Sequence, residues 1–262
     1  MTQLFWFGLA LKILLTAGIV VTASVAVERS GPFVGAMIAA LPTAAAAAYI
    51  ILALEHDAEF LARSAVGSLV ANAATCVFAC TYVILSRHRG VLLSLGVAIL
   101  TWLACALATR AVNWTIVSAA LLNAAVFAAT ILATASVRRS VGASKKPDRR
   151  AYDLVWRAVI VTSFVVVVTT ASHRIGAFAS GLFAVFPIAM SSFAYILHTR
   201  LGGDVAGRVL AHALIPLIGF AAGFVVLHAV VAAVGVWWGL LAHLATCLVW
   251  TALVWAWRAR RG

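Results

Sequence analysis

Charged residues are scarce in this chain of 262 residues, and the acidic ones are scarcest, with only 7 Asp and Glu. Charged residues make up 10% of the sequence and apolar residues 65%, whereas an average soluble domain has about 25% and about 45–50%. A soluble core of this size could not bury so much apolar surface. The composition therefore excludes a soluble globular protein and predicts an all-α polytopic membrane protein.

Cysteine and catalytic motifs are also scarce. The sequence has 4 cysteines, all inside apolar runs and without metal-ligand spacing, so we expect buried thiols and no disulfide framework. It has no His-Glu-x-x-His motif, no phosphate-binding loop and no nucleophile elbow. We therefore expect no enzyme activity, no metal site and no cofactor.

Basic residues outnumber acidic ones 19 to 7. In a membrane protein this excess sets the topology and contacts lipid headgroups. The long polar stretch at residues 138–150, RRSVGASKKPDRR, lacks interleaved aromatic residues. We therefore expect it to meet the lipid bilayer, and we expect no nucleic-acid partner.

The apolar runs are long enough for nine membrane spans, because a helix needs about 20 apolar residues to cross the hydrocarbon layer. The predicted spans are 4–27, 32–54, 59–86, 90–109, 112–137, 152–172, 176–197, 205–232 and 236–257. Lys12 interrupts the first run, which has no small-residue cleavage site. We expect a retained first helix rather than a signal peptide.

Basic residues are distributed unevenly between the two ends of these spans. With residues 138–150 placed in the cytoplasm, the outer ends hold only Arg63, Arg110 and Arg174. Of the 19 basic residues, Lys12 lies within a span and the other fifteen lie at inner ends. This bias predicts an N-terminus outside and a C-terminus inside.

An offset of 145 residues aligns the second half of the chain with the first. It pairs Pro42 with Pro187, Glu59 with Asp204, Lys12 with Arg157, Arg29 with Arg174 and Arg63 with Arg208. Five spans separate the copies, so the second copy enters the membrane from the opposite side. We predict one four-helix repeat in residues 1–111, a linker helix with a basic cytoplasmic loop in 112–150, and an inverted four-helix repeat in 151–262.

Each repeat has a basic residue in its first helix and a Gly-led second helix with a central proline. The segments LPTAAAAAYI and GLFAVFPIAMSSFAYI carry these features best, within residues 8–65 and 153–210. In these features each repeat resembles the GlpM family of small bacterial inner-membrane proteins. The resemblance implies a multi-pass protein of the bacterial inner (cytoplasmic) membrane, but no substrate and no catalytic residue. The tandem form departs from the family, which normally has one short unit per chain.

Pro42 and Pro187 lie about a dozen residues into their predicted helices, where a proline removes a backbone hydrogen bond. The freed carbonyl needs a polar neighbour or a water-lined cavity. Thr43 follows the first proline, and Ser191 and Ser192 follow the second by about one turn. These five residues are candidates for a substrate pathway. The alternative is a packing kink satisfied by Ser or Thr.

Lys12 and Arg157 are the matched cations of the first helix in each repeat. They lie about 12 Å and about 9 Å inside opposite membrane boundaries, where a cation usually faces a cavity or a partner. We interpret both as candidate pathway residues. The alternatives are snorkelling to the interface and, for Arg157, a pair with Asp153 on the same helix face.

Two acidic residues open the third and eighth predicted helices, each followed four residues later by arginine: Glu59 with Arg63, and Asp204 with Arg208. Such pairs complement the helix dipole and add little stability. A gate at opposite membrane faces, or a carboxylate that couples transport to protons, is the functional alternative. Arg29 and Arg174 join this group of gating or coupling candidates.

Inverted repeats are the usual construction of alternating-access transporters, with the substrate near the midplane. The inward-leaning charges are mainly cationic. We therefore expect a secondary transporter for a small anionic solute. A flippase for a lipid-linked phosphate, bound by its headgroup, is the alternative within transport. A non-transporting scaffold for envelope-synthesis enzymes is the alternative from another class. The sequence leaves homo-oligomerisation open.

Overall fold

The computed structural model describes residues 2–29, 43–139 and 151–260, without the side chains near some of these ends. The described residues form helices and short connections without a β-strand, so the all-α prediction is confirmed for them. The first part of the second predicted span lies outside the described residues, and Pro42 lies there too. The side chains of Arg29, Thr43 and Asp153 also lie outside the described set.

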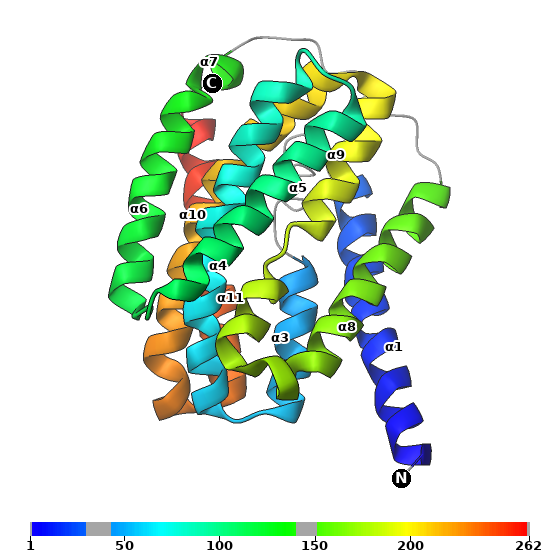
Figure 1. The fold of residues 1–262 in the computed structure, drawn as a ribbon, viewed down its shortest axis with the longest axis vertical. Coiled ribbons are helices and arrows are strands. Elements are labelled where there is room, and N and C mark those ends of the chain that lie inside the picture. Colours follow the sequence, from blue (N-terminus) through cyan, green and yellow to red (C-terminus); the bar gives the residue numbers. More distant parts are fainter. Residues whose placement is uncertain (1, 30–42, 140–150, 261–262) are drawn as a thin grey trace.

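Within each described range the helices follow one another with few intervening residues (Figure 1). They are α1 (Thr2–Arg29), α3 (Thr43–Glu55), α4 (Ala58–Ser86), α5 (Val91–Ala108), the 3-10 helix η1 (Thr109–Ala111), α6 (Ile116–Ala133), α7 (Ala135–Arg139), α8 (Ala151–Ala184), α9 (Ile188–Leu201), α10 (Gly203–Val234) and α11 (Val236–Ala259).

In the described part of the chain, six helices are long and apolar enough to cross a membrane: Ala58–Ser86, Val91–Ala111, Ile116–Ala133, Val155–Leu201, Gly203–Val234 and Val236–Trp257. Two shorter apolar helices cover Trp6–Thr22 and Ala44–Glu55. These lengths and compositions agree with a polytopic membrane protein. The N-terminal end of α1 and the C-terminal end of α11 lie at opposite ends of the bundle (Figure 1).

Polar residues fix where several helices begin. The Asp57 side chain accepts a hydrogen bond from the backbone N–H of Phe60 at the start of α4. Thr115 and Ser118 exchange hydrogen bonds in a capping box at the start of α6. These contacts satisfy N–H groups that a helix leaves without partners in its first turn. The tight break expected after α5 is therefore a 3-10 turn followed by a capped helix.

Helix α4 is the centre of the bundle and is buried along most of its length. It packs against α5, α6, α8 and α10. Gly67 of α4 lies against the backbone of Phe178, and Gly181 lies against the backbone of Ser64, with no room for a Cβ at either glycine. Small residues let membrane helices approach this closely.

Helix α8 reverses direction at Gly176, whose φ of 78° and ψ of 170° interrupt the helix. Only glycine adopts this backbone conformation readily. After the reversal, residues 177–184 return along α4, and α9 continues toward the opposite end of the bundle (Figure 1). The boundary between the sixth and seventh predicted spans, at about residues 172–176, therefore coincides with the reversal at Gly176.

Candidate functional site

The helix that returns after Gly176 is broken in its middle. The chain leaves the helix after Ala184 and resumes it at Ile188, with Pro187 at φ −76° and ψ 43°. The sequence predicted a proline kink within a continuous helix, but the structure has two separate helices. The backbone N–H of Ser191 then donates to the Pro187 carbonyl at 2.8 Å, which starts the new helical ladder.

The break lies beside the middle of α4. The Thr75 hydroxyl donates to the Ala71 carbonyl of its own helix at 2.9 Å and, more weakly, to the Val185 carbonyl at 3.3 Å, an acceptor that a continuous helix would bond to residue 189. Trp102 donates its indole N–H to the same Thr75 oxygen at 3.1 Å, and its ring packs edge-on against Phe186. Thr75 and Trp102 thus complete the site. Sequence analysis missed them because nothing in the local sequence marks them as neighbours of the proline.

The first turn of α9 begins at the break without a side-chain cap, and of its backbone N–H groups that of Ile188 donates to the Phe186 carbonyl at 2.7 Å. Ser191, one turn into this helix, is 8% exposed, and its hydroxyl has no hydrogen-bond partner in the described part of the chain. Ser192 instead donates to the carbonyl of Ala189 at 2.8 Å. The two predicted serines therefore differ, since Ser191 can bind a ligand and Ser192 is occupied by its own helix.

A buried amide pair lies one turn from Thr75. Asn72, at the midpoint of α4, donates to the Asn123 side-chain oxygen at 3.0 Å and to the Leu217 carbonyl at 3.3 Å. Asn123 donates in turn to the Leu69 carbonyl at 2.7 Å. Buried amides in a membrane bundle hold helices together and mark functional centres. The sequence analysis did not single out either asparagine.

Lys12 forms an ion pair with Glu55, with 2.8 Å between Nζ and Oε1. The Lys12 side chain is 13% exposed and that of Glu55 is 27% exposed. Lys12 therefore has an acidic partner within the described part of the protein, one of the two environments expected for a cation at this depth. Glu55 follows directly after the last residue of the second predicted span. An acidic residue at the end of a span was the feature of the sequence that could have identified it as a partner for Lys12.

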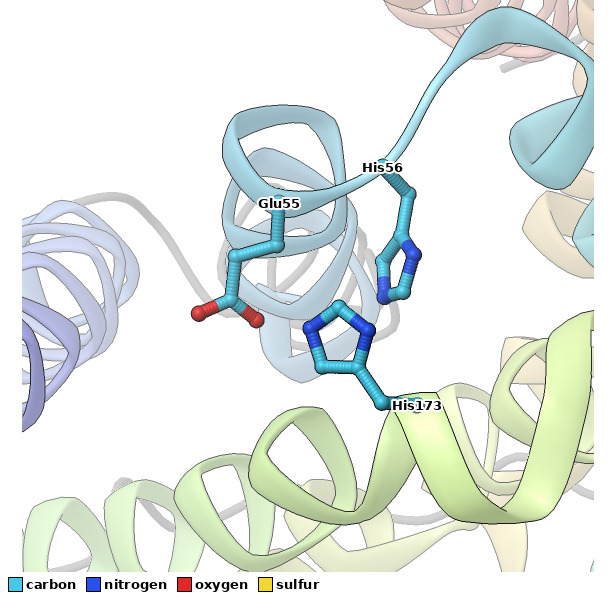
Figure 2. A group of neighbouring side chains, drawn as sticks. All are labelled: Glu55, His56 and His173. Carbon is cyan, nitrogen blue, oxygen red and sulfur yellow. The ribbon is translucent and has the colours of Figure 1, made fainter.

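Two histidines lie on one side of Glu55, with the His173 ring between the Glu55 carboxylate and the His56 ring (Figure 2). His56 Nε2 lies 2.8 Å from the Ser172 hydroxyl, and the His56 ring stacks on Phe60 with 3.6 Å between centroids. The His173 ring lies 4.3 Å from the His56 ring. Partial burial lowers the pKa of His56, and His173 lowers it further, whereas the nearby carboxylates oppose the shift.

The other predicted charges have separate positions. Arg157 is buried, with its guanidinium carbon 5.8 Å from the centre of the Phe193 ring. Arg63 pairs with Glu59 at 2.6 Å as predicted, but both side chains are more than 70% exposed, so the pair contributes little stability. Arg174 is exposed.

The predicted pair between Asp204 and Arg208 is wrong for the described part of the chain. Asp204 forms its ion pair with Arg87, at 3.2 Å, across the junction between α4 and α10. The α10 backbone comes close enough because Gly203 lies directly against the Ser86 carbonyl. Tertiary packing thus supplies a different partner from the one four residues along the helix.

The predicted site residues do not form one cluster. Pro187 and Ser191 belong to the break beside α4, whereas Lys12 belongs to the ion-pair and histidine cluster at the end of α3. Comparison of the chain with protein-family models, with curated proteins and with solved structures finds no match.

Proposed function

We propose that the protein is a secondary transporter that moves a small anionic solute across a membrane by alternating access between two inverted repeats. One observation carries this proposal: the uncapped start of α9 lies at a helix break in the middle of the bundle, beside the buried hydroxyl of Ser191. Discontinuous helices near the midplane form the substrate sites of many transporters, and their N-terminal ends bind anionic groups.

The contact between α4 and α10 supports the repeat. The 145-residue offset makes these two helices equivalent, and they pack extensively against each other. Asn72 donates to Leu217, which is its own equivalent at this offset. A residue that contacts its equivalent lies on the axis relating two repeats. The Asn72 position is thus the proposed axis, and it lies one turn from the Thr75 contact to the helix break.

A second pair of contacts has the same relation. His228 Nδ1 lies 2.9 Å from the Ala62 carbonyl. Adding 145 to Ala62 gives Gly207, and subtracting 145 from His228 gives Val83. A Cβ on Gly207 would lie 3.6 Å from the Val83 carbonyl, so this pair is also in contact. In the proposal, residues 1–111 and 151–262 are the repeats, and residues 112–150 link them. Nine spans result when the part of α8 before Gly176 is one span and the part after Gly176 forms another together with α9.

The preference for an anion does not come from the excess of basic residues, because several of these residues are already paired. Lys12, Arg63 and Arg87 are each paired with a carboxylate. The positive end of the α9 dipole and the Ser191 hydroxyl therefore provide the attraction at the break. In this proposal the Arg87–Asp204 pair joins the two repeats at one end of the pathway and acts as a gate.

Cysteine accessibility tests the proposal without a known substrate. In a variant lacking Cys76, Cys80, Cys105 and Cys247, Ser191→Cys is labelled in oriented proteoliposomes with an anionic, membrane-impermeant methanethiosulfonate. Alternating access predicts reaction from both sides, faster than with the cationic analogue of the reagent. Ser180→Cys is the matched control, because Ser180 is also buried but its hydroxyl bonds the Gly176 carbonyl; this variant is expected to stay unreactive.

The outcomes separate the alternatives. Reaction of Ser191→Cys from neither side indicates a non-transporting scaffold, and reaction from one side only contradicts alternating access. Equal rates for the two reagents contradict the anionic site. A positive result leads to counterflow measurements with labelled phosphate, sulfate and succinate, which compare the chemical classes of anion directly.

A further inference from the structure

Three potential metal ligands converge at one end of the bundle. Glu55 ends α3, His56 lies in the connection to α4, and His173 lies on α8 three residues before the Gly176 reversal. One ligand atom from each lies within 4.8 Å of the others. Figure 2 shows the His173 ring between the Glu55 carboxylate and the His56 ring. Residues 117 positions apart in the sequence therefore point their polar atoms at one another.

We propose that Glu55, His56 and His173 bind a zinc ion, with a water as the fourth ligand. Two imidazoles and one carboxylate form a set that suits Zn²⁺, whereas Mg²⁺ and Ca²⁺ prefer oxygen ligands throughout. In a tetrahedral zinc site the ligand atoms lie about 3.4 Å apart. The present separations need to close by about 1 Å or a little more, which side-chain rotation can supply because His173 is exposed.

The surroundings hold His56 in a ligating position. Its ring is stacked on Phe60, and Nε2 lies 2.8 Å from the Ser172 hydroxyl. The Ser172 side chain is itself buried and donates to the Thr169 carbonyl at 2.7 Å. Such outer contacts orient the ring of a ligating histidine and are part of most metal sites.

Lys12 competes with the metal. Its Nζ lies 2.8 Å from Oε1 of Glu55, so two cations would share one carboxylate when zinc binds. The repulsion between them weakens zinc binding. Removing the Lys12 charge should strengthen zinc binding, whereas removing any ligand should weaken it. This opposite sign distinguishes a built site from nonspecific binding to surface histidines.

The site has a structural consequence because its ligands come from separate elements. Zinc would tie the α3–α4 connection to α8, just before the chain reverses. On the proposed transport function, this bond would join the two repeats at one membrane face and hold that face closed. The equivalent positions at the 145-residue offset are Arg200, Leu201 and Glu28, which is not a zinc-binding set, so the clamp would act from one face only.

The test is zinc binding to the untagged full chain in detergent, measured by calorimetry, with Co²⁺ absorption as a probe of tetrahedral geometry. His56→Asn and His173→Asn should each weaken zinc affinity by about 100-fold. Lys12→Met should strengthen it by about tenfold, the effect of removing one charge about 6 Å from a divalent ion. His228→Asn is the control and should leave the affinity unchanged, since His228 lies on α10 against the Ala62 carbonyl.

Weaker binding to Lys12→Met, or equal losses in the control, would overturn the site. So would a wild-type dissociation constant above about 100 μM. If the histidine variants fail to fold, the Lys12→Met affinity and the Co²⁺ spectrum still decide the question. Binding is measured without transport, so a failure of the transporter proposal leaves this test intact, and the reverse also holds.

Discussion

Replacing Thr75 by valine tests the contact that holds the helix break against α4. Valine has nearly the same shape but lacks the hydroxyl. The change leaves the Trp102 indole N–H without its acceptor and the Val185 carbonyl without its donor. Trp102 is 0% exposed, so water cannot replace the lost partner. A buried group left without a partner costs about 1–3 kcal/mol, and bonds between membrane helices average about 0.6 kcal/mol.

We therefore expect Thr75→Val to lower the free energy of unfolding by about 1–2 kcal/mol. The midpoint of thermal unfolding should fall by about 2–8 °C, since a protein of this size shifts by about 2–4 °C per kcal/mol. Tryptophan fluorescence in detergent measures the transition. Thr75→Ser keeps the hydroxyl and should lose no more than about 1 kcal/mol, the value of one methyl group.

A double-mutant cycle with Trp102→Phe separates the hydrogen bond from other effects. Phenylalanine has no N–H to orphan, so Thr75→Val should cost about 1 kcal/mol less in that background. An equal cost in both backgrounds would refute the proposed role of the Trp102–Thr75 bond. Wild-type stability of Thr75→Val would refute the wider conclusion that α4 supports the break.

Two further predictions concern the same core. Gly181→Ala should cost about 1–3 kcal/mol through overpacking, because the new Cβ meets the α4 backbone at Ser64, whereas Gly96→Ala, with nothing within 4 Å, should leave the melting temperature unchanged. Asn123→Ala should cost about 1–3 kcal/mol, because Asn72 loses one of its two acceptors and the Leu69 carbonyl loses its side-chain donor. Thermal unfolding measures the Gly181 and Asn123 variants, and stability equal to wild type in either would contradict the packing described for α4.

The features that depend on local sequence could be predicted, and these include the helical class, the membrane character and a disturbance of the helix at Pro187, although as a kink and not as a break. Each follows from hydropathy, helix length or the backbone chemistry of proline within a few residues. The severity of the break was not predictable, because it depends on Thr75 offering the Val185 carbonyl another partner. That contact joins residues 110 positions apart.

The ion pairs also divide into those that follow from local sequence and those that depend on tertiary packing. Glu59 and Arg63 lie on one helix, and their pairing follows from helical spacing alone. Asp204 had a partner available at the same spacing, yet it pairs with Arg87 because two helices meet there without intervening side chains at Gly203. The cluster around Glu55 was missed for a related reason, since His173 reaches it only through the path of α8.

The close contact between α4 and residues 177–184 also determines the order of events during synthesis. The hydroxyls of Ser64 and Ser68 donate to the carbonyls of Ala177 and Gly181, each 113 residues later in the chain. A ribosome adds about 5–20 residues per second, so α4 is made about 6–23 s before its partner. During that interval the serine hydroxyls can bond the carbonyls of their own helix, and the glycine face has no neighbouring helix to pack against. The most buried helix of the finished protein is therefore among the first to enter the membrane and one of the last to be enclosed.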